Sequence, residues 1–343
     1  MKVGLVYDPI YLRHDTGAHV ENRRRLEETI NLLESSGLLG RLKLLKPRKA
    51  ILEELLLVHD SSHISRVEAV SGQGGGWLDA DTVTSPDSYE VALYAAGGVL
   101  QAVDAVLRGE VSSAFCLVRP PGHHATRLRA MGFCLFNNVA VAAKYARVTH
   151  KLERVLIADF DVHHGNGTQE AFYSDPSVLY FSTHQYPFYP GTGAIDEVGH
   201  GAGRRTTVNV PLPAGCGDEE YLRVYEEILV PVARRFGPQL ILVSAGFDPH
   251  WADQIAMMEL SLSGFARIVE LLKGLAEELC EGRLIFTLEG GYNVRALSHG
   301  VKSTLGILLG EGPGEDPLGP GAARGRSTQV GSILEAVKKV QQL

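Results

Sequence analysis

Short apolar runs alternate with longer amphipathic segments along most of this chain. The runs are rich in β-branched residues and mostly lack polar positions, which predicts strands buried on both faces of a sheet. They cover residues 3–7, 42–45, 114–118, 155–159, 178–182, 206–210, 240–244 and 284–288. Helical periodicity is found at 20–36, 88–108, 135–148, 218–235, 262–281 and 294–309. This alternation predicts an α/β fold, a single large domain whose mostly parallel sheet is flanked by helices.

A change of composition near residue 311 predicts where this domain ends. Residues 311–327 are rich in Gly and Pro and show no apolar period, which indicates a connection with little regular structure. An amphipathic helix is expected at 329–342. We therefore expect residues 1–310 to form the main domain, and residues 311–343 to supply a connection and a C-terminal helix packed on it.

Composition narrows the classes of protein to consider. The chain has 343 residues, of which 45% are apolar, and a net charge of −7, which argues weakly against binding to nucleic acid. No stretch approaches 18 uninterrupted apolar residues, and Asp8 interrupts any signal-peptide core, so we expect a cytoplasmic protein without a membrane span. Cys116, Cys134, Cys216 and Cys280 form no C-x-x-C pair and are expected to be buried free thiols.

Polar residues gather directly after four of the predicted strands. The segments are RPPGHHA (119–125), DFDVHHGNG (159–167), SAGFD (244–248) and LEGGYN (288–293). Because ligands bind outside the carboxyl ends of the strands in open parallel sheets, these four segments are expected to converge on one crevice.

The second segment carries the chemistry of a metal site. Asp159, Asp161 and His163 alternate along an extended chain, so their side chains project from the same face. Two carboxylates crowded on one face repel each other unless a cation lies beside them. Together with Asp248, Asp161 and His163 would make a three-ligand site for zinc or another divalent ion, with open positions for water and a carbonyl oxygen. A single aspartate at a strand end could instead cap a helix, but that explains the whole set poorly.

Two further segments offer groups for proton transfer. His123 and His124 follow a rigid Pro-Pro-Gly turn, and two adjacent imidazoles beside a metal suggest a general acid–base pair. Tyr292 follows Gly290 and Gly291, which allow close approach to a ligand, so its phenol could donate a hydrogen bond to a developing oxyanion. The alternative for Tyr292 is a tyrosine that caps the last core strand.

These four segments, in this order and spacing, resemble those of the zinc-dependent histone deacetylase superfamily, which includes acetylpolyamine amidohydrolases. The segments 55–67 (LLLVHDSSHISRV), 131–143 (MGFCLFNNVAVAA) and 189–193 (YPGTG) also fit its pattern. The resemblance spans roughly residues 3–309, and it implies that residues 1–310 are a deacetylase catalytic domain. The LEGGYN and HHGNG variants look more like class II and bacterial members than class I.

The resemblance implies a role for individual residues. The zinc ligands would be Asp161, His163 and Asp248, and the catalytic residues His123, His124, Tyr292, Asp159 and Asn166, with Asp159 orienting His123 and Asn166 orienting His124. Substrate would contact Gly132, Phe133, Tyr189, Ile255 and Gly290, although the family more commonly has phenylalanine at the position of Tyr189. A structural potassium ion is implied at Asp159, Asp161, His163, Ser182 and Thr183.

The partners of the two histidines predict a division of labour. A carboxylate such as Asp159 stabilises an imidazolium, whereas the amide of Asn166 does so less. Our hypothesis is that His124 is neutral near pH 7 and takes a proton from the attacking water. His123 would tend toward the cation and favour the negative charge that develops in the intermediate.

Two alternative metal sites fit the sequence less well. His59 and His63 have the spacing of an H-E-x-x-H motif, but Asp60 replaces the glutamate, so we expect a structural role. The arginase-like branch of this fold uses two metal ions, and it would need further carboxylates in D-x-H-x-D and D-x-D arrangements. Gly165 stands where the first of these would lie, so a single metal is expected.

Substrate is the open question. The implied function is removal of acetyl or other acyl groups from the lysine ε-amino group of proteins or peptides. An acetylpolyamine or other small amide is the alternative, because Asp15, Asp253 and Glu259 could act as rim charges, although Ile255 stands where polyamine-selective relatives can carry an acidic residue. A catalytically inactive acyl-lysine-binding protein is the third hypothesis. Replacement of zinc by iron(II), and a homodimer as oligomeric state, stay open.

Overall fold

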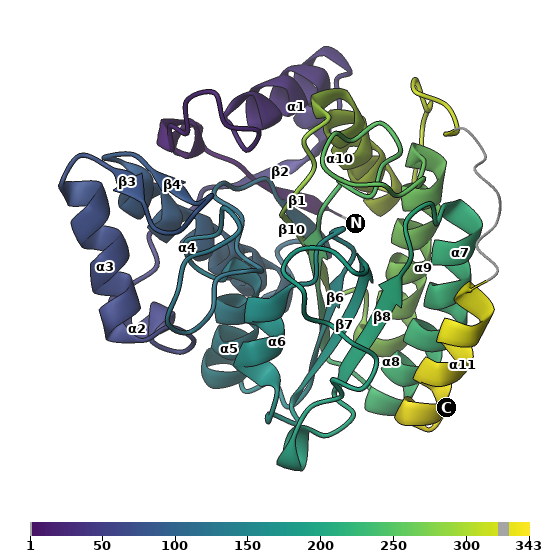
Figure 1. The fold of residues 1–343 in the computed structure, drawn as a ribbon. Helices are drawn as coiled ribbons and strands as arrows, with labels where there is room; N and C mark the ends of the chain where they lie inside the picture. The colour runs from purple at the N-terminus through teal and green to yellow at the C-terminus, as the bar shows by residue number, and fades with distance from the viewer. Residues whose placement is uncertain (1, 322–328) are drawn as a thin grey trace.

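Eight strands form one parallel sheet at the centre of the molecule (Figure 1). This computed structural model describes residues 2–321 and 329–343. The strands are β1 (Val3–Val6), β2 (Lys43–Leu45), β5 (Ser113–Cys116), β6 (Val155–Asp159), β7 (Val178–Gln185), β8 (Thr207–Leu212), β9 (Leu240–Ala245) and β10 (Leu284–Leu288). Their order in the sheet is β2-β1-β5-β10-β9-β6-β7-β8, and every neighbouring pair is parallel. The predicted fold class is confirmed.

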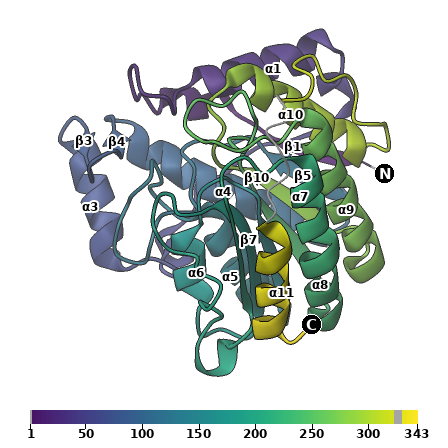
Figure 2. The same cartoon turned by 45° about the vertical axis from the view of Figure 1, so that its right-hand side comes forward.

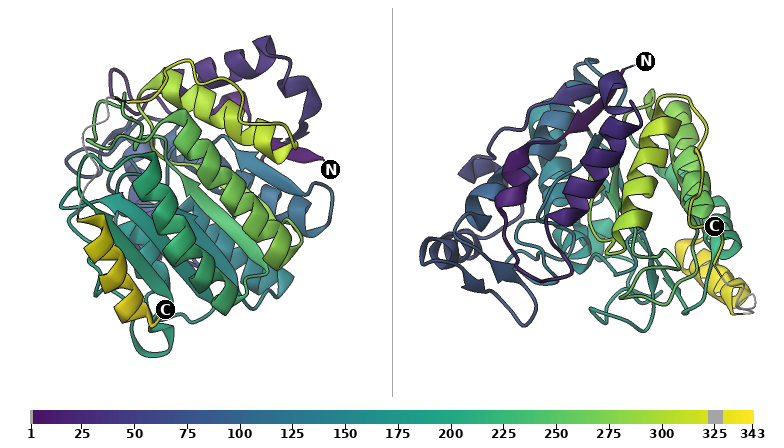
Figure 3. Two further views of the ribbon diagram at one scale, coloured as in Figure 1. Left: turned by 90° about the vertical axis from the view of Figure 1, so that its right-hand side faces the viewer. Right: turned by 90° about the horizontal axis from the view of Figure 1, so that it is seen from above.

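Helices cover both faces of the sheet, so the central strands are buried on both sides (Figures 2 and 3). The helices α4 (Ser88–Leu107) and α5 (Asn138–His150) pack against each other and on one face. The helices α1 (Arg24–Ser35), α9 (Leu262–Cys280) and α10 (Val294–Leu308) cover the other face together with the segment Asp218–Phe236. This sandwich explains why the strands are apolar throughout rather than alternating.

The observed elements depart from the predicted ones in five places. A two-stranded antiparallel hairpin, β3 (Gly76–Trp77) with β4 (Val83–Thr84), and the helices α2 (Leu52–Leu55) and α6 (Asn166–Phe172) were not predicted, because each is too short to show a period. A further helix, α3 (Ser61–Gly72), carries His63. The helix predicted at 218–235 consists of α7 (Asp218–Val224), a π-helical turn (Tyr225–Leu229) and α8 (Val230–Phe236). Pro231 lacks the N–H that a regular helix needs there, which accounts for the π turn.

Helix α4 has the length and hydropathy of a membrane-spanning helix, and it is the only such helix among the described residues. Its most apolar window is 72% buried within the structure, against β1, β5, β10 and α5. That burial is what a core helix of this sheet requires. All four cysteines are free and buried, as expected from the sequence.

The C-terminal helix α11 (Val330–Gln341) lies along β8, at one edge of the sheet (Figure 3). Its buried side chains include Val330, Leu334 and Val337, and the Gln341 amide donates a hydrogen bond of 2.8 Å to the Thr207 carbonyl. The end of the predicted 311–327 connection, residues 322–327, lies outside the described residues. The helix thus covers an edge strand that would otherwise present unpaired backbone groups.

Deleting residues 329–343 is expected to destabilise the domain and to promote association. Three buried apolar side chains would be lost, which corresponds to roughly 5 kcal/mol in the free energy of unfolding. Urea denaturation and light scattering measure both effects, and Leu334→Ala should shift the midpoint in the same direction by less. A truncated chain as stable and as monodisperse as the full chain would contradict this role of α11.

Candidate active site

The four polar segments meet at the carboxyl ends of four adjacent strands, β5, β10, β9 and β6. The segment 119–125 follows β5, 159–167 begins at the end of β6, Asp248 follows β9, and 289–293 follow β10. Parallel strands bring their carboxyl ends to one edge, so residues up to about 170 positions apart become neighbours there. The convergence of the four segments expected from the sequence is therefore observed.

Asp161, His163 and Asp248 form a buried cluster whose possible ligand atoms all lie within 4.8 Å of one another. The Nδ1 atom of His163 lies 3.1 Å from Oδ1 of Asp161 and 3.4 Å from Oδ2 of Asp248. Burial and the neighbouring Asp161 raise the pKa of Asp248 to about 7. Burial disfavours the His163 cation, but the proximity of the Asp161 and Asp248 carboxylates outweighs this and raises its pKa to about 9. The cluster therefore stabilises positive charge at its centre.

The residues of this cluster fit a bound divalent ion. Oδ2 of Asp248 is buried and has no hydrogen-bond partner among the described residues, although a buried carboxylate oxygen normally has one. A side chain on Gly290 would collide with the carboxylates of Asp161 and Asp248, and one on Gly246 with Asp161. Two carboxylates and one imidazole nitrogen are ligand types that zinc accepts, and three protein ligands leave positions for water and substrate.

The histidine pair lies beside this cluster. Nδ1 of His123 is 3.1 Å from Oδ2 of Asp159, and Nδ1 of His124 is 2.8 Å from Oδ1 of Asn166. Nε2 of His123 lies 3.8 Å from Asp161, and the two imidazole centroids are 4.0 Å apart. The structure thus brings each histidine to the partner that the resemblance implies.

These environments shift the two histidine pKa values in opposite directions. Burial disfavours the charged form of His123, but the carboxylates of Asp161 and Asp159 outweigh it and raise its pKa to about 10. Burial and the neighbouring His123 and His163 hold the pKa of His124 well below its usual range. The directions agree with a neutral His124 and a cationic His123, and which ring takes a proton during turnover stays a prediction.

Tyr292 is 7% exposed and lies near the carboxylates of Asp248 and Asp161, which with burial raise the pKa of its phenol. Its backbone is held by Asp253, whose Oδ2 accepts hydrogen bonds from the N–H groups of Tyr292 at 2.7 Å and Asn293 at 2.9 Å. Asp253 is only 8% exposed, so the suggestion that it is a rim charge is wrong. A carboxylate five residues after Asp248 instead fixes the loop that carries the phenol.

Aromatic side chains surround the cluster. The ring of Phe133 lies 5.8 Å from that of Tyr292, and the ring of Tyr189 lies 5.1 Å from that of His124. Phe188 stacks on His163 at 5.3 Å and His19 contacts Phe133 at 4.5 Å, and the sequence did not indicate either of them. Phe133 and Tyr189, for which the resemblance implies contact with substrate, therefore lie beside the cluster.

The remaining substrate-contact candidates lie in the same region. Gly132 has a positive φ of 55°, and a Cβ there would collide with the His124 ring, so glycine is required. The backbone N–H of Gly290 donates to Asp161 at 2.8 Å. Ile255 is partly buried, and its N–H donates to Asp253 at 3.1 Å, which joins this loop to the one carrying Tyr292.

The residues implied in potassium binding lie beneath the cluster. Asp159 and Ser182 are paired across β6 and β7, and the Thr183 hydroxyl lies 3.5 Å from the carbonyl oxygen of Asp159. All three are fully buried. Their oxygen atoms are thus close together, and an ion bound by them stays a prediction.

A buried charge network that the sequence did not indicate braces the site from α1. Arg25 and Arg119 both bind Glu21, with nitrogen–oxygen distances of 3.0 and 2.5 Å, and all three side chains are inaccessible to solvent. Nε of Arg25 also donates to the carbonyl of Gly291 at 2.8 Å, and its guanidinium lies 5.2 Å from the Tyr292 ring centroid. The only local signal was the i, i+4 spacing of Glu21 and Arg25.

His59 and His63 do not belong to the cluster. Nδ1 of His59 lies 2.9 Å from the carbonyl of Thr126 and its Nε2 accepts from the N–H of Asn137 at 2.8 Å, while Nε2 of His63 lies 2.9 Å from the Leu135 carbonyl. Both nitrogens of His59 are therefore used in holding loops together. The expectation of a structural role agrees with these bonds.

Three comparisons describe what this chain resembles. A model of the histone deacetylase domain matches residues 19–308. A probable deacetylase of Archaeoglobus fulgidus is 44% identical over 312 residues, which cover 90% of this chain and 86% of that protein. A histone deacetylase-like amidohydrolase of Pseudomonas aeruginosa is 43% identical over 274 residues, covering 80% and 71%. The crystal structure of the HDA15 HD domain superposes with a TM-score of 0.91 at 36% identity, covering 99% of this chain and 94% of that one.

The hydrogen bonds of His59 predict how stability depends on pH. Burial and His63 lower the pKa of His59 to about 3, so the unfolded chain takes up a proton below pH ~6.5 that the folded chain refuses. The contribution of His59 is therefore fully present above pH ~6.5 and falls by about 1.4 kcal/mol per pH unit below it.

The variant His59→Gln is the control, since its amide can donate and accept at the same positions without titrating. The difference in free energy of unfolding, wild type minus variant, should shrink by about 2 kcal/mol between pH ~7 and pH ~5. Urea denaturation at both pH values measures it. A difference independent of pH, or a variant that loses bound metal, would contradict the structural assignment.

Proposed function

This chain belongs to the histone deacetylase family, and on that premise we propose that it is a zinc-dependent deacetylase acting on acyl-lysine in proteins or peptides. The observation that carries the proposal is the convergence of three buried ligand atoms with two proton-carrying imidazoles and a buried phenol. Each of these groups has a use in hydrolysis of an amide, and the aromatic rings beside them suit the extended methylene chain of an acyl-lysine.

A divalent ion held by Asp161, His163 and Asp248 would polarise the acyl carbonyl and lower the pKa of water. His124, held neutral by its surroundings, accepts the proton of the attacking water. The Tyr292 hydroxyl, protonated because burial raises its pKa, donates a hydrogen bond to the carbonyl oxygen as that oxygen gains negative charge. As the C–N bond of the amide breaks, a histidine of the pair gives a proton to the departing nitrogen, so the free lysine amine and the carboxylate of the acyl group are released.

The chain's own residues also set the charge and shape around the substrate. The cationic tendency of His123, held by Asp159, favours negative charge on the tetrahedral intermediate. The carbonyl of Gly132 is the proposed acceptor for the amide N–H, and Phe133 and Tyr189 the proposed walls. Asp159, Asp161, His163, Ser182 and Thr183 are the proposed ligands of a structural potassium ion.

An acetylated polyamine is the second candidate substrate. A polycation needs several unpaired carboxylates at the mouth of the site, and Asp253 is committed to the backbone of the Tyr292 loop. Ile255, on the same loop, adds no charge. These two observations favour an acyl-lysine peptide over a polyamine. The third candidate, an inactive acyl-lysine-binding protein, would retain the complete set of proton-transfer groups without using it.

The test is a hydrolysis assay on one panel of substrates, an acetyl-lysine peptide, acetylspermidine and longer acyl-lysines, before and after removal of metal by a chelator. We expect acetate release from the peptide, loss of it after chelation and recovery with one equivalent of zinc. Binding of the peptide without turnover would favour the inactive binder, and faster turnover of acetylspermidine the second candidate. Turnover that survives complete metal removal would contradict the proposal.

Tyr292→Phe is expected to lower kcat by ~10²–10³, because one oxyanion donor is lost while the ring packing is kept. The bound metal should remain at one equivalent per chain, since the phenol is outside the three-ligand set. Steady-state kinetics and elemental analysis together check both points. Near-normal kcat in this variant would remove Tyr292 from the mechanism.

A further inference from the structure

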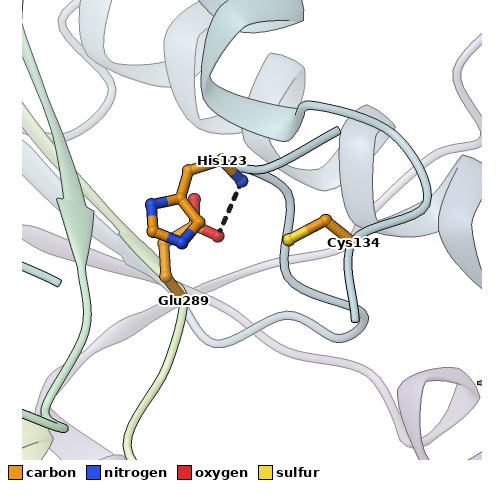
Figure 4. A group of neighbouring side chains, drawn as sticks. All are labelled: His123, Cys134 and Glu289. Carbon is orange, nitrogen blue, oxygen red and sulfur yellow. Dashed lines mark hydrogen bonds between the residues drawn. The ribbon is translucent and has the colours of Figure 1, made fainter. Parts of the chain in front are cut away.

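A second group of buried polar side chains, His123, Cys134 and Glu289, lies next to the histidine pair (Figure 4). Its possible ligand atoms also lie within 4.8 Å of one another, which is the spacing of a metal site. Figure 4 shows the Glu289 carboxylate and the Cys134 sulfur both directed toward His123 from different segments of the chain. The group is therefore either a second metal site or a structural contact between these segments.

The hydrogen bonds of the group argue against a second metal. Oε2 of Glu289 accepts from the backbone N–H groups of Gly122 at 2.7 Å and His123 at 3.1 Å, the latter drawn as a dashed line in Figure 4. Its Oε1 accepts from the Ser244 hydroxyl at 3.3 Å. Burial keeps Cys134 a thiol by raising its pKa, and its Sγ donates to the Gly132 carbonyl at 3.3 Å. A metal would have to displace these bonds.

Glu289 instead joins the two loops on which the proposed chemistry depends. It is the first residue after β10, three positions before Tyr292, and its side chain holds the loop of the histidine pair after β5. Its own carbonyl accepts from Nη2 of Arg25 at 2.5 Å, so its backbone is fixed from a third direction. The side chain is inaccessible to solvent.

The histidine loop is confined on its other side as well. A Cβ on Gly122 would meet the N–H of Asn138 at 2.5 Å and the carbonyl of Phe136 at 2.7 Å, so the loop already touches the start of α5. The backbone of this loop is therefore held between the start of α5 on one side and the two hydrogen bonds to Glu289 on the other. Both hydrogen bonds end on the same oxygen, Oε2, so the contact requires an acceptor oxygen at this reach.

We propose that Glu289 is a positioning residue that sets the placement of His123 and His124 relative to Tyr292 by binding the backbone N–H groups of Gly122 and His123. The proposal rests on the proposed function, because it assigns Glu289 an effect on turnover through the histidine pair. A displacement of catalytic groups by about 1 Å can cost ~10²-fold in rate, which sets the expected size of the effect.

Four variants separate geometry from charge. Glu289→Ala removes both acceptors, Glu289→Gln keeps an acceptor oxygen at the same reach, and Glu289→Asp keeps the charge but withdraws it by one methylene. Thr287→Val is the matched control, since it changes a buried polar side chain two positions earlier, within β10. All four are compared with wild type as zinc-loaded full-length chains.

Glu289→Ala and Glu289→Asp are expected to lower kcat by ~10²-fold with KM changed by less than about threefold, while Glu289→Gln stays within about tenfold of wild type. Thr287→Val should match wild type. Metal content should be one equivalent in every variant. If Glu289→Ala does not fold, the order of the Gln and Asp variants still decides, because a requirement for charge predicts the reverse order.

Hydrogen–deuterium exchange gives a readout that does not depend on activity. The amides of Gly122 and His123 should exchange roughly tenfold faster in Glu289→Ala and Glu289→Asp than in Thr287→Val, because each loses its protecting hydrogen bond. If wild type hydrolyses no substrate, the proposed function fails while this measurement still tests the contact. Unchanged exchange, an Asp variant more active than the Gln variant, or a second metal equivalent lost from the Glu289 variants would overturn the proposal.

Discussion

The close approach of two buried carboxylates, Asp161 and Asp248, is the constraint on which the rest of the site depends. Both are inaccessible to solvent, and both lie against Nδ1 of His163. Burying one unpaired charge is costly and burying two of the same sign beside each other more so, unless a positive charge accompanies them. The absence of side chains at Gly246 and Gly290 leaves the room in which these groups converge. A divalent ion satisfies this arrangement better than hydrogen bonds alone, since Oδ2 of Asp248 lacks a hydrogen-bond partner among the described residues.

Five carboxylates lie at this edge of the sheet, and their partners set their different roles. Asp161 and Asp248 face the proposed ion, whereas Asp159 faces the ring of His123. Asp253 and Glu289 accept backbone N–H groups, the first from the Tyr292 loop and the second from the histidine loop. The same chemical group thus binds a cation, orients an imidazole or fixes a loop. Distance and burial decide which. Burial raises the pKa of Asp159, Asp248, Asp253 and Glu289, whereas at Asp161 the neighbouring His123 and His163 outweigh burial and lower the pKa.

Much of the fold was readable in the sequence, because its strands are buried on both faces. All eight strands of the sheet were predicted, most within two residues of their ends, although β7 continues to Gln185. The hairpin β3–β4 has two residues per strand and shows no period, and α6 begins inside a glycine-rich motif at Asn166. The segment 218–235 looked continuous because α7, the π turn and α8 follow one another without a break. Hydrophobic periodicity indicates which positions are buried, and it cannot be recognised in an element that spans too few residues to repeat.

The site was predictable where motifs hold its residues together, and less so elsewhere. Asp159, Asp161 and His163 lie within five residues, so the sequence already brings them together. Only Asp159 belongs to β6, however, and the other two follow it in a bend rather than in an alternating strand. Contacts made across the chain gave no local signal. Arg25 binds the carbonyl of Gly291, 266 positions away, and Glu289 binds the N–H of Gly122, 167 positions away. Asp253 was misjudged as a rim charge, since its acceptors point into the fold toward Tyr292. Only the folded structure shows which carboxylates are exposed to solvent.

The most direct test of the central claim is a crystal structure of the zinc-loaded protein, with anomalous scattering recorded above and below the zinc edge. The account predicts one strong anomalous peak within bonding distance of Asp161, His163 and Asp248, and none between His123, Cys134 and Glu289. A strong peak elsewhere, or a well-ordered site with water alone between the two aspartates, would contradict it.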